Sequence, residues 1–173
     1  MKFGIIMGST REGRVSPGVA AFVKEVADQR SEHEFEIIDI LDYDLPFLGT
    51  GEGDKRWNNK IAELDGYIFV AQEYNHSMSA ALKNAIDHAR EEWFNKAAGI
   101  VSYGSAGGVR AAEHLRQVMG EQYVAVVRTN PAFSLFTDFE NFSQFRPGDH
   151  HLPGINDMLD ELLLWSEAFK TIR

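Results

Sequence analysis

Residues 3–26 read FGIIMGSTREGRVSPGVAAFVKEV, and this stretch decides the fold. The first five residues are apolar apart from one glycine, which is typical of a strand buried on both faces. Glycine and hydroxyl side chains follow over residues 8–14 and predict a turn. The apolar residues that come next at helical spacing are Val19, Phe22, Val23 and Val26. Together these features predict a strand, a glycine turn and a helix, which is the start of a βαβ unit.

The same alternation continues along the chain. Short apolar runs predict further strands at residues 35–40, 66–71, 97–103 and 123–127. Helical spacing predicts helices around residues 57–64, 78–90, 109–119 and 155–169. Five strands alternating with helices indicate right-handed crossovers, and therefore an α/β sandwich of three layers around a five-stranded parallel sheet. Ligands of such sheets bind beyond the carboxyl ends of the strands.

Length and composition limit the possible classes of protein. A chain of 173 residues fits one domain, which we take to span residues 1–173. The absence of cysteine excludes disulfides, thiolate catalysis and iron–sulfur clusters. A net charge of −9 argues against a nucleic-acid partner. No apolar run approaches the ~20 residues that a membrane span needs, and the N-terminus lacks a signal-peptide pattern, so we expect a cytoplasmic protein.

The first loop, residues 8–16, is a candidate phosphate site. Free N–H groups and the positive end of the helix dipole favour an anion there, and Ser9, Thr10 and Ser16 add hydroxyl donors. Either Arg11 or Arg14 could add a charged contact. A P-loop is excluded because Arg14-Val15 stands where that motif requires Lys-Ser/Thr. The dinucleotide-binding pattern G-x-G-x-x-G is also absent, because Thr10 stands where its second glycine is required. The alternative is a polar turn whose serines cap the helix.

Two later loops also follow predicted strands. Glu73-Tyr74-Asn75-His76-Ser77 combines polar groups with one aromatic ring, which could read the edge of a planar heterocycle. Glu73 could act in acid–base chemistry, but a structural role as a helix cap is favoured. His76 by itself suits a surface loop. His150-His151 is a weak sign of a metal, and we expect none.

The third loop runs from Tyr103 through Gly104, Ser105 and Ala106 to Gly107-Gly108. Three glycines in five residues permit positive φ and let the backbone approach a flat ring closely. A tight turn into the next helix is the alternative, and one glycine would satisfy it.

Taken in order, these three loops resemble the NADPH-dependent FMN reductase family. The resemblance covers residues 3 to about 123 and rests on Gly8-Ser9-Thr10-Arg11, on Glu73-Tyr74-Asn75-x-Ser77 with residues 82–87 (LKNAID), and on Gly104-Ser105-x-Gly107-Gly108. It implies a flavodoxin-like fold with bound FMN. The implied cofactor-binding residues are Ser9, Thr10, Arg11, Arg14, Val15, Ser16, Glu73, Tyr74, Asn75, His76, Ser77, Tyr103, Gly104, Ser105, Gly107 and Gly108.

Within this set, the resemblance assigns the FMN phosphate to Ser9, Arg11, Ser16 and nearby loop amides. Residues 73–77 would line the isoalloxazine and the ribityl edge, and the third loop would lie on the other side of the flavin. Two residues depart from the family: Gln72 and Ser79 stand where prolines are usual. Because a proline ring restricts the backbone, we expect these changes to loosen the turn.

The activity implied by the resemblance is hydride transfer from NADPH or NADH to FMN. Electrons then pass to a small acceptor, such as a quinone, free flavin, an azo compound or a metal oxyanion. No general base is required, so no catalytic side chain is expected. A homodimer or homotetramer is also implied. The alternatives are a flavodoxin-type electron carrier, a sensor that has lost the flavin, and, least favoured, a nucleotide hydrolase.

Five phenylalanines recur at every third position from Phe133 to Phe145. This spacing matches neither a strand nor a straight α-helical stripe. Two hypotheses are about equally supported: a long loop packed on its own core, or a lid or subunit contact that walls the flavin site.

Overall fold

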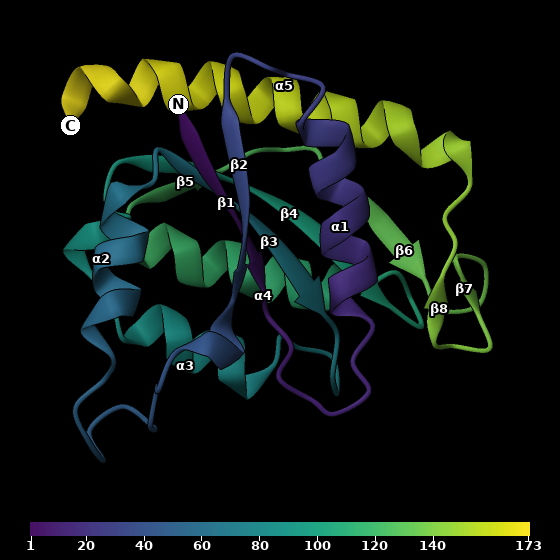
Figure 1. Ribbon diagram of the computed structural model, residues 1–173, viewed down its shortest axis with the longest axis horizontal. Helices are drawn as coiled ribbons and strands as arrows, with labels where there is room; N and C mark the ends of the chain where they lie inside the picture. Colours follow the sequence, from purple (N-terminus) through teal and green to yellow (C-terminus); the bar gives the residue numbers. More distant parts are fainter.

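The computed structural model describes all 173 residues as a parallel sheet between two layers of helices (Figure 1). The strands are β1 (Lys2–Met7), β2 (Glu34–Asp39), β3 (Gly66–Gln72), β4 (Lys96–Gly104), β5 (Val124–Val126), β6 (Ala132–Ser134), β7 (Phe139–Glu140) and β8 (Gln144–Phe145). The α-helices are α1 (Ser16–Ala27), α2 (Lys55–Glu63), α3 (Ala80–Asp87), α4 (Val109–Glu121) and α5 (Leu152–Phe169). None of these helices combines the length and apolar composition that a membrane crossing requires.

The strand order is β2-β1-β3-β4-β5, with every neighbouring pair parallel. The predicted flavodoxin-like architecture is therefore confirmed. The order reverses between β1 and β3, because the chain runs outward from β1 to β2 and then returns across β1 to form β3. This reversal is the position at which doubly wound sheets bind ligands. The loops that leave β1 and β3 lie together at the lower edge of the molecule in Figure 1.

Two apolar cores explain why the strands are continuous apolar runs. Residues of β1, β3 and β4 alternate between a core beneath α1 and α5 and a second core beneath α2, α3 and α4. All seven residues of β3 are buried, since side chains on both of its faces pack against helices. The sheet is thus held rigid where the functional loops leave it.

The edge beside β4 is the main departure from the predicted strands. β5 pairs only with residues 96–98, and a further strand, β6, pairs with residues 102–104. Between them Asn130 donates from Nδ2 to the Ile100 carbonyl at 2.9 Å. The sequence predicts one fifth strand because the polar stretch between β5 and β6 reads as a loop, whereas the pairing of β6 is a tertiary contact.

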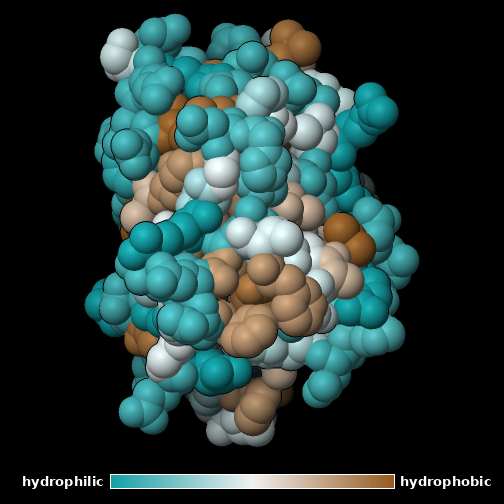
Figure 2. Space-filling model, turned by 90° about the vertical axis from the view of Figure 1, so that its right-hand side faces the viewer, coloured by the Kyte–Doolittle hydropathy of each residue, from teal (hydrophilic) through white to brown (hydrophobic).

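Each of the two hypotheses describes part of the phenylalanine segment, residues 133–145. Phe133 and Phe139 are buried in the core beneath α1, whereas Phe136 and Phe142 are 68% and 61% exposed and pack edge to face with ring centroids 5.7 Å apart. Figure 2, which looks onto the side that carries β6 to β8, shows apolar residues gathered near the middle of that face. Part of the segment is core, and part is an exposed aromatic pair.

Phe142 also has a left-handed backbone, with φ of 56°. This conformation costs a residue with a Cβ about 1–2 kcal/mol, and asparagine tolerates it better. We expect Phe142→Asn to raise the free energy of unfolding by about 0.5–1 kcal/mol in urea denaturation, the loss of contact with Phe136 offsetting part of the gain. Phe136→Asn is the matched control, because Phe136 is equally exposed without a positive φ. A gain in the control as large as in Phe142→Asn would contradict the backbone explanation.

Candidate flavin site

The first loop presents an unusual number of free backbone donors. Gly8 makes the last sheet contact, donating from its N–H to the Val70 carbonyl at 3.1 Å. None of the five N–H groups of residues 9–13 donates a hydrogen bond within the chain. These groups precede α1, whose positive dipole end adds to the attraction for an anion. The loop therefore has the donor set of an anion site.

Ser16 provides a second, independent sign of a ligand. Its side chain is fully buried, and its Oγ has no hydrogen-bond partner. The N-cap of α1 is Val15, and no side chain caps the helix. The alternative in which the serines of this loop merely cap the helix is therefore wrong. A buried hydroxyl without a partner is costly unless a ligand satisfies it.

The two arginines of the loop have different roles. Arg14 forms a two-pronged ion pair with Asp39 at the end of β2, with Nη1–Oδ1 at 2.7 Å, and also donates to the Ser9 carbonyl at 2.6 Å. The hydrogen bond to Asp39 raises the pKa of Arg14 above its ordinary value. Arg11 is exposed and makes no ion pair. Of the two arginines, only Arg11 is therefore without a carboxylate partner, and the neighbouring Glu12 is likewise exposed and in no ion pair.

The second loop is a two-residue hairpin. Tyr74 and Ser77 exchange backbone hydrogen bonds of 2.9 and 3.0 Å, and Asn75 and His76 between them have φ of 49° and 68°. Left-handed backbone at two consecutive residues other than glycine is uncommon and costs free energy, so other contacts must hold it. The Tyr74 hydroxyl reaches the first loop, where it lies 3.0 Å from the Ser9 Oγ.

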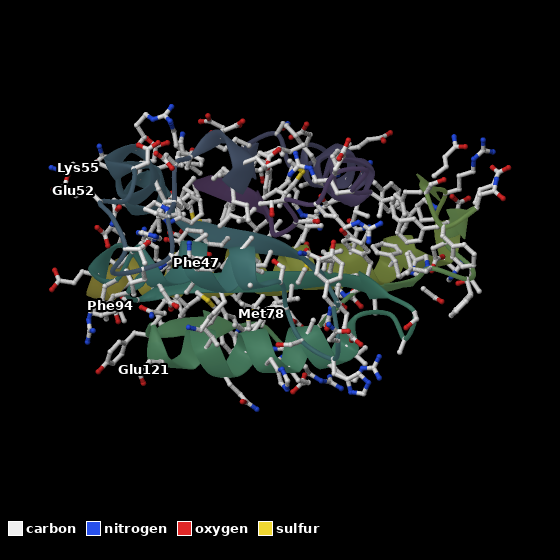
Figure 3. The ribbon with its side chains drawn as sticks, turned by 90° about the horizontal axis from the view of Figure 1, so that it is seen from below. Phe47, Glu52, Lys55, Met78, Phe94 and Glu121 are labelled. Atoms are coloured by element: carbon white, nitrogen blue, oxygen red, sulfur yellow. The ribbon has the colours of Figure 1, made fainter.

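Contacts from α4 hold this hairpin in place. Glu73 accepts hydrogen bonds from the Arg110 side chain and, at 3.1 Å, from the Arg110 backbone N–H. Arg110 also contacts His76 at 3.0 Å, and His114 contacts the Ser77 hydroxyl at 2.9 Å. Figure 3 shows Met78, which follows the hairpin, beside α4. Glu73 thus has the structural role favoured by the sequence, but it binds the start of α4 rather than that of α3.

Burial alone would raise the pKa of the Glu73 carboxyl, whose side chain is 4% exposed. The hydrogen bond and charge of Arg110, with backbone N–H groups of α4, outweigh burial and bring the net pKa below its ordinary value. Glu73 is therefore held as a carboxylate. Arg110 and His114 were not among the predicted site residues, since nothing in the local sequence of α4 connects them to a loop more than 30 residues away.

The third loop is a tight turn between β4 and α4, and its own backbone conformation requires glycine. Gly107 and Gly108 have φ of 72° and 74°, and a Cβ on Gly108 would lie 2.6 Å from the Tyr103 nitrogen. At Gly108 the glycine is therefore needed by the strand-to-helix turn itself. Ser102 donates to the Gly107 carbonyl at 2.7 Å, which fixes the same turn, whereas Ser105 is exposed.

A cavity of about 270 Å³ lies where the first two loops meet β4 and the phenylalanine segment. Its lining residues are Arg11, Gly13, Arg14, Val15, Tyr74, Tyr103, Leu135 and Phe142. Five of the predicted residues, Arg11, Arg14, Val15, Tyr74 and Tyr103, thus share one cavity. The other predicted residues do not line it: Ser9, Thr10, Ser16, Glu73, Asn75, His76, Ser77, Gly104, Ser105, Gly107 and Gly108. Burial raises the pKa of Tyr103, so its phenol stays neutral. Leu135 and Phe142 lie in the wall of this cavity, so part of the phenylalanine segment lines it.

These features fit FMN. Free N–H groups, an unpaired arginine and a buried hydroxyl suit its phosphate, and the aromatic rings of Tyr74, Tyr103 and Phe142 suit its flat isoalloxazine.

The sequence of residues 1–138 matches the family model described as NADPH-dependent FMN reductase. The chain belongs to the NADPH-dependent FMN reductase family. An NAD(P)H-dependent FMN reductase of Schizosaccharomyces pombe is 38% identical over an alignment of 149 positions, and the match covers 79% of this chain and 74% of the relative. An NAD(P)H:quinone oxidoreductase of Solanum tuberosum is 37% identical over an alignment of 131 positions, and the match covers 68% of this chain and 66% of the relative.

Among solved structures, the flavoenzyme NAD(P)H:(acceptor) oxidoreductase FerB of Paracoccus denitrificans superposes with a TM-score of 0.73 at 18% identity. The match covers 94% of this chain and 97% of FerB, and shows the shared fold. As a member of the family, this reductase is an oxidoreductase with FMN as cofactor and NAD(P)H as electron donor.

Where the family resemblance led us to expect prolines, the reductase has Gln72 and Ser79, whose side chains join the second loop to the first. Gln72 donates from Nε2 to the Gly8 carbonyl at 2.8 Å, and the Ser79 hydroxyl donates to the same oxygen at 2.5 Å. Ser79 also caps α3 by accepting from the Leu82 N–H at 3.0 Å. The expected loosening of this turn is therefore wrong, because side-chain hydrogen bonds replace the restraint of proline rings.

The histidine pair 150–151 gains a partner that the sequence did not indicate. His151 lies 2.8 Å from the buried carboxylate of Asp138, and ligand atoms of Asp138, His150 and His151 lie within 4.8 Å of one another. Asp138 also accepts from the Ser134 N–H at 2.8 Å. These contacts tie the segment that carries Phe142 to the start of α5.

Proposed function

We propose that the first loop holds the FMN phosphate and that the loops after β3 and β4 flank the isoalloxazine. The observation that carries this proposal is the buried, unpartnered Ser16 Oγ beside five free backbone N–H groups. Arg11 supplies the charge, and the Arg14–Asp39 pair shapes the loop without adding net charge.

FMN, when bound, accepts two electrons as hydride from NAD(P)H and passes them on. The protein's part is to orient and to exclude water. The Ser9–Tyr74 contact joins the loops on either side of the sheet reversal, and Leu135 and Phe142 wall the cavity with apolar surface. The exposed Phe136–Phe142 pair would suit a flat acceptor. We propose a quinone, free flavin, an azo compound or a metal oxyanion as acceptor, with a cytoplasmic location and a homodimeric or homotetrameric assembly.

An absorbance spectrum of the purified protein tests the assignment. We expect a yellow protein, or a colourless one that takes up FMN stoichiometrically. Under anaerobic conditions, adding NADPH or NADH should bleach the flavin absorption band, and a quinone should then restore it. Rapid bleaching distinguishes a reductase from an electron carrier, which would need a separate enzyme to reduce it. A protein that takes up no FMN would end the proposal.

A further inference from the structure

Two buried side chains converge on one carbonyl at the start of the first loop. Gln72 is 1% exposed and Ser79 is 6% exposed, and both donate to the Gly8 oxygen. Gln72 ends β3, whereas Ser79 begins α3, so the two donors come from both ends of the second loop. Buried polar groups are normally hydrogen-bonded, and these two use the same acceptor. Two donors directed at one loop carbonyl indicate that the direction of this carbonyl matters.

The direction of the Gly8 carbonyl determines that of the next N–H. The peptide bond is planar and trans, so the Gly8 C=O and the Ser9 N–H point in opposite directions. Because the carbonyl points to Gln72 and Ser79, the Ser9 N–H points away from them. That N–H makes no hydrogen bond within the chain, although Ser9 is buried. A rotated peptide would instead direct a carbonyl oxygen to the position where the proposed phosphate binds.

Gly8 is closely packed, and its own N–H is fixed by the Val70 carbonyl at 3.1 Å. A Cβ on this residue would lie 2.9 Å from the end of the Leu82 side chain and 3.2 Å from the Val70 carbonyl, so a larger residue would crowd both. Glycine has wide backbone freedom and does not itself select one peptide orientation. The two side-chain donors restrain the Gly8 carbonyl itself, and Arg14 restrains the next carbonyl, that of Ser9.

From this geometry, and on the basis of the proposed FMN site, we infer that Gln72 and Ser79 are positioning residues for phosphate recognition. By holding the Gly8 carbonyl they keep the Ser9 N–H directed at the phosphate. Their effect is on the preference for FMN over riboflavin, which lacks the phosphate, rather than on the affinity for the ring.

The test compares the dissociation constants of FMN and riboflavin, measured by quenching of flavin fluorescence. We expect Gln72→Met and Ser79→Ala each to weaken FMN binding about fivefold to tenfold, as loss of the hydrogen bond to Gly8 implies, while riboflavin binding changes less than twofold. Ser79→Ala also removes the N-cap hydrogen bond of α3, so the thermal stability of the flavin-free variant is measured alongside. Ser79→Thr keeps the hydroxyl and should restore the preference for FMN. Ser166→Ala removes a buried, unpartnered serine hydroxyl in α5 and is the control, with no change expected.

A purely structural role for Gln72 and Ser79 predicts that both variants lose affinity for FMN and for riboflavin by the same factor. That outcome would overturn the inference, as would unchanged affinity for both flavins. If Gln72→Met does not fold, the Ser79→Ala and Ser79→Thr pair makes the same comparison. A second readout is thermal stabilisation of the flavin-free protein by inorganic phosphate, which should be smaller in both loss-of-donor variants. If the unmodified protein binds neither flavin, the proposed function fails; if it binds FMN and the variants keep its preference, only this inference fails.

Discussion

Replacing Arg11 with alanine should weaken FMN binding about 10- to 150-fold and leave riboflavin binding nearly unchanged. Arg11 is the arginine of the first loop that has no carboxylate partner. A hydrogen bond to a charged group contributes about 1.5–3 kcal/mol, which corresponds to this range of affinity. The measurement is titration of the flavin-free variant with each flavin. Because the Arg11 side chain is exposed and makes no hydrogen bond or ion pair, the variant should keep the thermal stability of the unmodified flavin-free protein.

Two variants sharpen this result. Arg90→Ala removes another arginine without an ion pair, outside the three loops, and should leave FMN affinity unchanged. Arg14→Ala should lower stability as well as affinity, because it leaves Asp39 without its partner. Equal FMN affinity in Arg11→Ala and the unmodified protein would remove Arg11 from the phosphate site.

The second large effect concerns the pair of Glu73 and Arg110. Arg110→Ala leaves a carboxylate buried without its counter-charge, a change that costs about 3–5 kcal/mol in fully buried pairs. The Arg110 side chain is 38% exposed, so solvent screens the pair, and we expect a loss of about 2 kcal/mol in the free energy of unfolding. Urea denaturation at neutral pH measures it. The second loop should also lose order, because His76 loses its contact as well.

The pH dependence of the free energy of unfolding shows whether the Glu73–Arg110 pair causes this loss of stability. The pKa of Glu73 is lowered in the folded protein, so the stabilisation by the pair is fully present above the unfolded carboxyl pKa of about 4.3. It is lost as the pH falls through the lower, folded value. The difference between the unmodified protein and Arg110→Ala should therefore shrink in acid. Adding Glu73→Gln to Arg110→Ala should recover part of the stability at neutral pH; no recovery would show that the pair is not the cause.

Local sequence determined the architecture and indicated the loops of the proposed site. Apolar runs such as residues 66–71 and the helical spacing that follows the first glycine turn are properties of neighbouring residues, so they predict the strands, the helices and the three loops. The motifs within those loops were sufficient to indicate the family. Short strands were predicted less well. The three-residue strand β6 was missed because it is stabilised by pairing with β4 rather than by its own residues.

Only the tertiary structure decided what each side chain does. Arg11 and Arg14 are alike in sequence, but Asp39, which is 25 residues from Arg14, neutralises one of them. Phe139 and Phe142 share one repeat, yet one is buried and the other walls the cavity. Gln72 and Ser79 look like losses of proline until both are seen to donate to Gly8. The physical reason is common to all three: charge compensation, burial and hydrogen-bond partners depend on residues brought together by the sheet, whereas helix and strand formation depends mainly on periodicity along the chain.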